Sequence, residues 1–370
     1  MPAVRRRVPS GQSHRAVHGE QRRKLRRGVQ VFEVRVKSET IQLAHGGGGR
    51  ASADLIAHEI LSRFGSPELA ALPDAATLPA LAGPLVVSTD GFVVSPIEFP
   101  GGNIGHLAVH GTVNDVAVAG GRPIWLSLAM ILEEGLPVAT LRRVLDAVRD
   151  SARDCGVTVM TGDTKVVPRG MCDGMYLTTT GIGEAWPGLA LDAARIREGD
   201  VVIVSGPLGD HGMAIMAARN GLRVADGFAS DTGPVHRLVE SVVDLGDALR
   251  FFRDPTRGGA AAVLNEIVRN RTVGIVLRET DLPVSPGARG VSELLGIDIL
   301  HVASEGRVIG VCAANAADEV LARWRGRPEG VGAFAIGRVT GDAGRVILET
   351  AIGGRRLVDV PQGELLPRIC

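Results

Sequence analysis

Lysine is almost absent from most of this sequence, which takes its positive charge from arginine. Beyond residue 37 the chain of 370 residues contains one lysine, Lys165. A guanidinium is charged at every accessible pH, whereas an ammonium can lose its proton and make point contacts to phosphate. A lysine kept in such a chain predicts a chemical role for Lys165. The alternative is a solvated lysine in a polar turn.

Aromatic residues and long apolar runs are also scarce. Aromatic residues are 3% of the chain, against 45% hydrophobic residues. The core must therefore be built from Val, Ala, Leu and Ile, as is typical of α/β and α+β enzymes rather than aromatic-rich binding sandwiches. No apolar run reaches the roughly 20 residues that span a bilayer. We expect a soluble, cytoplasmic protein with no membrane partner, long enough for two domains.

Cysteine pairs are missing. The four cysteines are widely scattered and form no CxxC pair: Cys155, Cys172, Cys312 and Cys370. This spacing argues against a zinc site and against a disulfide framework, and it indicates a reducing compartment. Three of the four lie in apolar surroundings, where cysteine is usually a small core residue. Cys370 stands apart because it is the last residue of the sequence.

The formal net charge of zero is the sum of a basic N-terminal stretch and an acidic remainder. Residues 1–37 hold eleven basic and two acidic residues, a net of +9, whereas the remainder holds thirty basic and thirty-nine acidic residues, a net of −9. The acidic body argues against a nucleic-acid partner. The basic stretch has no apolar segment of the kind a secretory signal needs. We expect a disordered extension there, with an organelle address, a nucleic-acid arm or a start assigned too far upstream as alternatives.

The first part of the body shows a glycine-rich loop and a run of β-rich sequence. Gly46–Gly49 precede a helical pattern, and a glycine loop that opens a helix can offer backbone N–H groups to phosphate. A flexible hinge is the alternative. Residues 85–95, LVVSTDGFVVS, predict two β-rich runs hinged at Asp90–Gly91, as in a hairpin or bulge. Asp90 is then a turn residue or a ligand.

Periodicity predicts the elements that follow. A helix begins near Ile104 and ends at Gly120–Gly121. Asn114 and Asp115 are poor residues in mid-helix, so their presence there indicates a ligand more than a solvated face. Residues 124–134 predict a strand, and residues 138–155 an amphipathic helix. Two more strands are expected, one over 157–167 that carries Gly-Asp-Thr-Lys and then Val-Val at its end, and one over 173–185.

The second half carries three short polar motifs and a terminal tail. Residues 200–212 predict a buried strand and a glycine turn into a helix from Met213, with His211 as a turn or capping residue. RDPTRGG at 253–259 predicts a turn with Thr256 as a possible N-cap. Glu305 is expected at the end of a strand. Residues 361–370 contain two prolines and no periodicity, so they predict an extended tail that spans up to about 34 Å.

Three carboxylates at the expected ends of elements match the ligands that Mg²⁺ prefers: Asp90, Asp115 and Asp163. Together with the glycine loop and Lys165, they fit a nucleotide site in which positioning and charge neutralisation perform the catalysis. Each signal is weak alone. In combination they predict a phosphoryl-transfer enzyme.

The sequence resembles the hydrogenase maturation factor HypE family of the PurM-like superfamily, which also includes aminoimidazole ribonucleotide (AIR) synthetase. The matching segments span residues 40–370 and include LAHGGGGR at 43–50, STDGFVVSP at 88–96, GTVNDVA at 111–117, GDTKVV at 162–167, GDHGMAI at 209–215, RDPTRGG at 253–259, SEG at 304–306 and the terminal PRIC. GTVND, GDTK and the terminal PRIC are specific in combination, although none is specific alone.

The resemblance implies a PurM-like α+β, or α/β, fold of two domains. It implies a β-rich N-terminal domain that forms a homodimer, a C-terminal α/β sandwich, and ATP in the cleft between them. The boundaries expected on this basis are residues 1–38 for the basic extension, 39–185 for the first domain, 186–360 for the second domain and 361–370 for a flexible tail.

The resemblance also implies a reaction. Family members receive a carbamoyl group on the C-terminal cysteine from the carbamoyltransferase HypF and dehydrate it with ATP to a thiocyanate. The cyano group then passes to iron on the HypC–HypD scaffold and becomes a ligand of [NiFe]-hydrogenase. An amide oxygen is a poor leaving group, so its phosphorylation by ATP is chemically reasonable. Loss of the amide protons requires a base.

Matching positions suggest roles for particular residues. Cys370 is the expected acceptor thiol, and Lys165 and Glu305 are the two candidates for the base, with no choice between them. Mg²⁺ is expected at Asp90, Asp115 and Asp163. The residues expected to contact ATP are His45, Gly46, Gly47, Gly48, Gly49, Asn114, Asp163 and Thr164. The alternatives are another ATP-dependent PurM-like enzyme that activates a different acceptor, and a non-catalytic scaffold that displays its cysteine tail.

Overall fold

Four strands in the first half form one sheet in the computed structural model of the protein, which describes residues 38–370 except 71, 225–226, 361–365 and 367. Their order is β1-β6-β4-β5. The strands are β1 (Leu85–Phe92), β4 (Gly121–Glu133), β5 (Thr158–Val167) and β6 (Met175–Ala185). Only the β4–β5 pair is parallel. A parallel pair needs a crossover, which α6 (Val138–Cys155) supplies, and β1 and β5 are the edges of this sheet.

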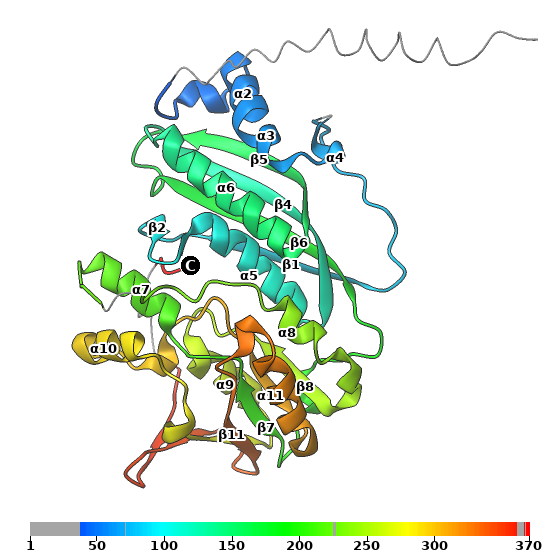
Figure 1. The fold of residues 1–370 in the computed structure, drawn as a ribbon, viewed down its shortest axis with the longest axis vertical. Helices are drawn as coiled ribbons and strands as arrows, with labels where there is room; N and C mark the ends of the chain where they lie inside the picture. The colour runs from blue at the N-terminus through cyan, green and yellow to red at the C-terminus, as the bar shows by residue number, and fades with distance from the viewer. Residues whose placement is uncertain (1–37, 71, 225–226, 361–365, 367) are drawn as a thin grey trace, which may run out of the picture. The chain divides into compact units, whose positions relative to one another are not determined.

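Two helices cover one face of this sheet (Figure 1). α5 (Ile104–Val118) contacts β1, β6 and β4, and α6 packs against α5. The two helices approach closely at Gly105, where a Cβ atom would lie 2.5 Å from the carbonyl oxygen of Val144. The predicted apolar stripe of α6 is buried, and its predicted bounds are confirmed.

Short helical segments precede the sheet. They are η1 (Leu43–Gly46), α2 (Arg50–Leu55), η2 (Ile56–Leu61), α3 (Ser62–Phe64) and α4 (Pro67–Ala70). Glu59 in η2 is buried and accepts hydrogen bonds of 2.7 and 2.9 Å from the guanidinium of Arg142 in α6. Arg63 adds a further contact to Glu59. The two guanidiniums lower the pKa of Glu59, so this carboxylate ties the helical segment to the sheet domain.

Seven strands form the sheet of the second half, in the order β13-β12-β9-β11-β7-β10-β8. They are β7 (Val201–Val204), β8 (Leu249–Arg253), β9 (Gly274–Arg278), β10 (Ile309–Cys312), β11 (Phe334–Thr340), β12 (Val346–Glu349) and β13 (Arg355–Leu357). Both faces are buried, because Val202 and Val204 belong to one apolar core and Ile203 to another. The second half is therefore an α/β sandwich.

Helices lie in both outer layers of this sandwich. The helices are α7 (Asp210–Arg219), α8 (His236–Glu240), α9 (Gly259–Val268), α10 (Pro286–Leu295) and α11 (Ala317–Arg325). The short 3₁₀ turns are η3 (Ala193–Arg195), η4 (Val243–Ala248), η5 (Glu279–Asp281), η6 (Ile299–His301), η7 (Ala314–Ala316) and η8 (Pro328–Gly330). α9 contributes to one core, and α8 and α11 contribute to the other.

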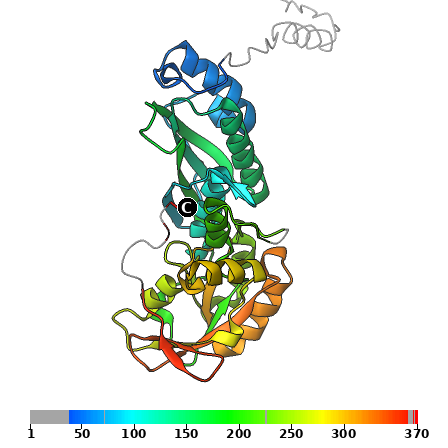
Figure 2. The ribbon, with the colours of Figure 1, turned by 90° about the vertical axis from the view of Figure 1, so that its left-hand side faces the viewer.

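The two sheets lie in separate halves that share a core (Figures 1 and 2). Ala117 and Val118, at the end of α5, pack in the same apolar cluster as Trp324 of α11. Residues 38–370 accordingly form one compact unit, distinct from residues 1–37. The predicted extension lies outside the described residues apart from Ser38. No helix in the described part of the chain is long and apolar enough to cross a bilayer.

One local prediction for the first half is wrong. Asp90–Gly91 forms no hairpin, because β1 continues through both residues and pairs with β6 from Leu85 to Phe92. The strand predicted over 157–167 is confirmed, because β5 runs from Thr158 through the GDTK motif to Val167.

Three predictions in the second half also need correction. α7 begins at Asp210, three residues earlier than expected, and α9 is capped by Gly258 rather than Thr256. Gly258 has a φ of 78°, a left-handed conformation that favours glycine. Glu305 lies in the loop between η6 and β10 rather than at the end of a strand.

Candidate active site

A polar pocket of about 540 Å³ lies between β1, the end of α5 and the segment that follows β8. Three carboxylates line it: Asp90, Asp115 and Asp254. The hydroxyl of Ser88 donates a hydrogen bond of 2.6 Å to Asp115, and the guanidinium of Arg257 lies 4.0 Å from Asp90. We call this the carboxylate pocket.

Burial and like charges raise the pKa values of Asp115 and Asp254 in this pocket. Burial is the main cause of the raised pKa of Asp115, and Asp90 adds to it. Asp254 is buried, and its desolvation together with the charge of Asp115 raises its pKa to about 7. Like charges in a dry pocket disfavour ionisation, and a cation relieves that penalty.

The pocket fits Mg²⁺ held together with phosphates. The described residues contain no group of three or more metal-binding side chains already arranged around one point. Mg²⁺ does not need such a cage, since it keeps several waters and binds through one or two carboxylates plus substrate phosphates. Asp115 and Asp254 are donors of that kind: burial raises the pKa of both, and the charge of Asp115 adds to the rise at Asp254.

Glu305 is buried beside the carboxylate pocket. It is 2% exposed, and its Oε1 atom has no hydrogen-bond partner. Its pKa is raised well above the ordinary value, first by burial and then by Asp254, Asp231 and Asp90. The thiol of Cys370 lies close enough to the Glu305 carboxyl for the two groups to shift each other's pKa. A buried carboxyl with a raised pKa can act as a general base.

The chain ends beside α7 and the segment that follows β1 (Figure 1), and its last residue, Cys370, lies against Glu305. Backbone N–H groups of Val93 and Ser95, just beyond β1, donate to the carbonyls of Cys370 and Arg368 over 3.2 Å each. Ile369 is buried between them. Burial and the Glu305 carboxyl raise the pKa of the Cys370 thiol well above its usual range. The predicted tail therefore ends docked, although 361–365 and 367 lie outside the described residues.

The other predicted residues gather at the opposite edge of the first sheet. The Nζ atom of Lys165 lies 2.9 Å from Asp163, and both side chains are mostly exposed. The glycine loop packs on the same strand, since a Cβ atom at Gly46 would lie 2.8 Å from Val166. This β5-edge group consists of His45, Gly46, Gly47, Gly48, Gly49, Asp163, Thr164 and Lys165. An apolar pocket of about 140 Å³ also reaches Asp163 and Thr164.

Asp163 does not join Asp90 and Asp115 within one chain, which corrects the predicted three-carboxylate magnesium site. Asp90 pairs with Thr179, whose hydroxyl donates to a carbonyl of α5, so both residues are on the helix-covered face. Asp163 lies in the row of residues paired across the sheet that also contains Gly91. Because side chains alternate between faces along a strand, Asp163 is on the face opposite to Asp90. Three strand spacings, about 14 Å, also separate the two edges. Lys165 is distant from Cys370 for the same reason.

Asn114 joins the two halves instead of facing an open pocket. Its side-chain amide donates to the carbonyls of Gly233 and Glu305 over 3.0 and 3.2 Å, and its oxygen accepts from the N–H of Val235 over 2.8 Å. The residue is 1% exposed. These bonds explain a polar residue in the middle of a buried helix without a nucleotide contact, and they fix the backbone that carries Glu305.

Asn114→Ala is expected to destabilise the protein by about 2–4 kcal/mol, because it leaves three buried backbone groups without a partner. Thermal or urea unfolding measures the change. Asn315→Ala, at an exposed position, is the control and should stay within about 0.5 kcal/mol of the unchanged protein. Equal stability of the two variants would show that the Asn114 contacts do not hold the halves together.

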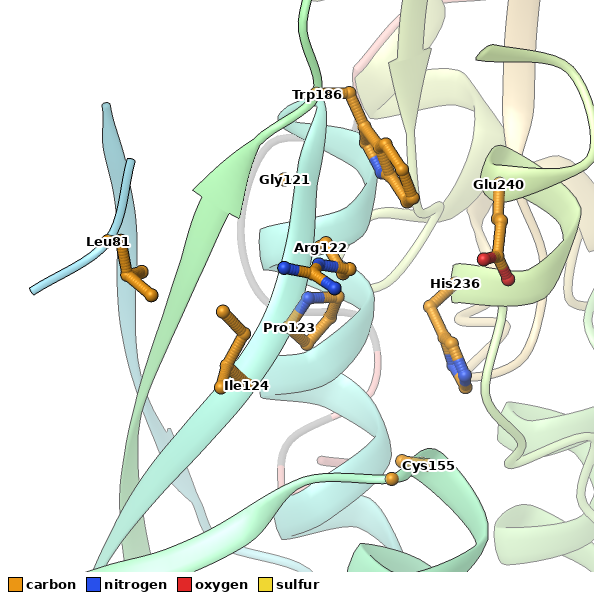
Figure 3. A pocket seen from close by; sticks show the side chains of 10 residues that line it. Leu81, Gly121, Arg122, Pro123, Ile124, Cys155, Trp186, His236 and Glu240 are labelled. Atoms are coloured by element: carbon orange, nitrogen blue, oxygen red, sulfur yellow. The ribbon is translucent and has the colours of Figure 1, made fainter. Parts of the chain in front are cut away.

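A separate pocket of about 400 Å³ lies where the start of β4, the end of α6 and α8 meet (Figure 3). Arg122 and Pro123 of β4 lie across it from His236 and Glu240. Burial raises the pKa of Cys155 at its floor to about 12, so this thiol is inert near neutral pH. The predicted site residues line other parts of the molecule.

Residues 73–185 and 197–349 match the family models described as the N-terminal and C-terminal domains of AIR synthase related protein. The "Carbamoyl dehydratase HypE" of Rhodobacter capsulatus is 48% identical over 341 residues, which cover 90% of this chain and 99% of the relative. This chain belongs to the HypE family. It is accordingly an enzyme of the carbamoyl dehydratase family of hydrogenase maturation, with the PurM-like α+β fold.

Solved HypE structures have the same fold. The crystal structure of HypE in complex with ATP superposes with a TM-score of 0.86 at 46% identity, covering 90% of this chain and all of that one. A HypE–HypF complex superposes with a TM-score of 0.73 at 40% identity, covering 83% of this chain and 99% of that one. The HypE family therefore includes a member that binds ATP and a member that binds HypF.

Two residues of this site were not predicted as its members. Asp254 follows β8 directly, and the reasoning that selected other acidic residues at the ends of elements could have found it. His211 was expected to be a turn or capping residue, yet it is fully buried in α7 and contacts the tail. Its partner Ile369 lies 158 residues away, so no local signal could have found this contact.

Proposed function

We propose that this protein dehydrates a carbamoyl group on the thiol of Cys370 to a thiocyanate at the expense of ATP. The docked tail carries this proposal, because it brings the thiol against Glu305 beside the carboxylate pocket. The solved HypE structure with ATP supports a nucleotide in this family. The product would supply cyanide ligands for the iron of [NiFe]-hydrogenase.

The proposed reaction balances with ATP, the carbamoyl group on Cys370 and a base beside it. The carbamoyl oxygen of the S-carbamoyl thioester takes the γ-phosphoryl group, which releases ADP. Loss of both nitrogen protons then forms the C≡N bond as the C–O bond breaks and phosphate leaves. Glu305 is the base we favour over Lys165, since Glu305 alone contacts Cys370 in the same chain. Asp90, Asp115 and Asp254 would hold Mg²⁺, which neutralises phosphate charge when it is bound.

A homodimer would reunite the two groups of predicted residues. The face of the first sheet away from α5 exposes Leu85, Val87 and Ile131 by 62%, 57% and 40%. An isologous dimer through this face can place the β5 edge of one copy against the β1 edge of the other. Asp163, Thr164, Lys165 and the glycine loop would then act on the partner's tail. We propose that they contact ATP from there.

The HypE–HypF structure supports a carbamoyltransferase of the HypF kind as the donor of the carbamoyl group. A HypC–HypD scaffold as acceptor of the cyano group and a cytoplasmic location stay predictions. So do the domain boundaries at residues 185 and 360, which we propose from the division of the strands between the two sheets.

Mass spectrometry of the terminal peptide tests the proposal. Incubation with HypF, carbamoyl phosphate and ATP is expected to add one carbamoyl group to Cys370 and then to remove the mass of one water, with one ATP consumed. Cys370→Ala should abolish both changes. ATP hydrolysis that is unaffected by Cys370→Ala would favour a different acceptor. A carbamoyl adduct that persists in the presence of ATP would favour the non-catalytic scaffold.

A further inference from the structure

The docked tail is held by three side chains that lie outside the carboxylate pocket. The Nε2 atom of His211 lies 2.6 Å from the carbonyl oxygen of Ile369. The guanidinium of Arg219 donates to the carbonyls of Ser95 and Arg368. Asp173 accepts from Arg368 over 2.5 Å. These contacts come from α7 and from the loop before β6, so they converge on the tail from both halves of the protein.

The hydrogen-bond pattern fixes the state of His211. A carbonyl oxygen can only accept, so Nε2 must carry the proton, and Nδ1 of a neutral ring accepts from the hydroxyl of Ser230 over 2.8 Å. The ring is fully buried and packs edge-to-face on Phe99, with centroids 5.5 Å apart. His211 is thus a rigid, single-tautomer donor aimed at the tail, and the chemistry at Glu305 does not use it.

The docked conformation depends on these contacts. Arg368 has a φ of 54°, a left-handed conformation that is unfavourable for a residue with a side chain. Its carbonyl accepts both from Ser95 and from Arg219, and its side chain pairs with Asp173. Loss of one anchor should therefore shift the tail toward the released state.

We propose that His211, assisted by Arg219 and Asp173, is a positioning residue that sets the balance between a docked and a released tail. The dehydration of the proposed function needs the docked state, whereas acceptance of a carbamoyl group from a partner needs a released thiol. Weaker contacts between these residues and the tail would then slow dehydration and speed the transfer of the carbamoyl group to Cys370. Loss of a fold-supporting residue would instead slow both.

Alkylation of Cys370 by iodoacetamide tests the anchor without relying on the proposed function. His211→Phe keeps the ring and its contact with Phe99 but removes the donor, so it is expected to speed alkylation of Cys370 about tenfold. His211→Gln retains an N–H at the place of Nε2 and should stay within about threefold of the unchanged protein. Peptide mass spectrometry follows each cysteine separately.

The buried thiols of Cys155 and Cys312 report on unfolding in the same experiment, because burial raises both pKa values to about 12. They should stay unmodified in both variants. Should His211→Phe unfold, Asp173→Asn is the second variant and is also expected to speed alkylation of Cys370, while Cys155 and Cys312 stay unmodified. Alkylation of Cys370 at the unchanged rate in folded His211→Phe and in Asp173→Asn would overturn the proposal, as would equal acceleration by His211→Gln.

The expected changes in the rates of carbamoyl loading and dehydration rest on the proposed function. In single-turnover assays, His211→Phe should load carbamoyl about tenfold faster and dehydrate it about tenfold more slowly, and His211→Gln should restore both rates. A fall in both rates would contradict a positioning role. If the unchanged protein takes up no carbamoyl group, the proposed function fails, and the alkylation result still decides whether His211 anchors the tail.

Discussion

Glu305→Gln is expected to slow dehydration of the carbamoyl group by about 10²–10⁴-fold while the variant still accepts the group on Cys370. The carboxyl of Glu305 lies against the thiol that carries the substrate, and its Oε1 atom has no hydrogen-bond partner. An amide in its place has nearly the same size but cannot take a proton. Accumulation of the carbamoyl adduct, followed by peptide mass spectrometry, measures the effect.

The pH profile provides a second measurement on this variant. Burial and the nearby Asp254, Asp231 and Asp90 raise the pKa of Glu305, and the Cys370 thiol faces the same carboxyl. A base works only when ionised, so the dehydration rate of the unchanged protein should rise with pH through this raised pKa. Glu305→Gln should lose that rise. A profile of unchanged shape would assign the base to another group.

Stability should change in the opposite direction from activity. A carboxyl whose pKa is higher in the folded state binds its proton more tightly there, so its contribution to stability falls as pH rises above about 4.3, the ordinary value for Glu. Glu305→Gln should therefore be more stable than the unchanged protein by about 1–2 kcal/mol near pH 8, with the difference vanishing near pH 4. Glu293→Gln, at an exposed position, is the control for the lost charge.

A mixture of Asp90→Asn and Lys165→Ala subunits is expected to recover about a quarter of the unchanged activity, although each variant alone should lose about 10²-fold or more. If Lys165 acts on the partner's tail, a mixed dimer contains one intact site and one doubly altered site. Random assortment makes about half of the dimers mixed, and each has half of its sites intact. Co-expression with two different tags gives the mixed dimer for direct assay.

The control for this experiment pairs two changes from the same side of the sheet. Asp90 and Asp115 both line the carboxylate pocket, so mixing Asp90→Asn with Asp115→Asn leaves no site intact and should restore nothing. Recovery in that control would point to subunit repair rather than shared sites. Failure of the Asp90→Asn and Lys165→Ala mixture to recover would show that Lys165 does not serve a partner's site.

Long helices with regularly spaced apolar residues could be predicted from the sequence, because this spacing involves only residues that are close in the chain. The apolar positions of α6 repeat at helical spacing from Val138 to Cys155, and Gly156 follows in a left-handed conformation that ends the helix. Asp90–Gly91 misled the prediction because its turn propensity is also local. Pairing of β1 with β6 along eight residues provides more hydrogen bonds than a two-residue turn, and tertiary context overrode the local preference.

The amino-acid sequence by itself determined the family, the elements of the first half from Ile104 onward, and the chemical types present at the site, because motif spacing and periodicity are properties of neighbouring residues. The tertiary structure decided which of those residues meet. Strand order and the alternation of faces separate Asp163 and Lys165 from Asp90 and Asp115. Docking of the tail brings Cys370 to Glu305 and Ile369 to His211, because contacts across 65 and 158 positions depend on how the halves pack.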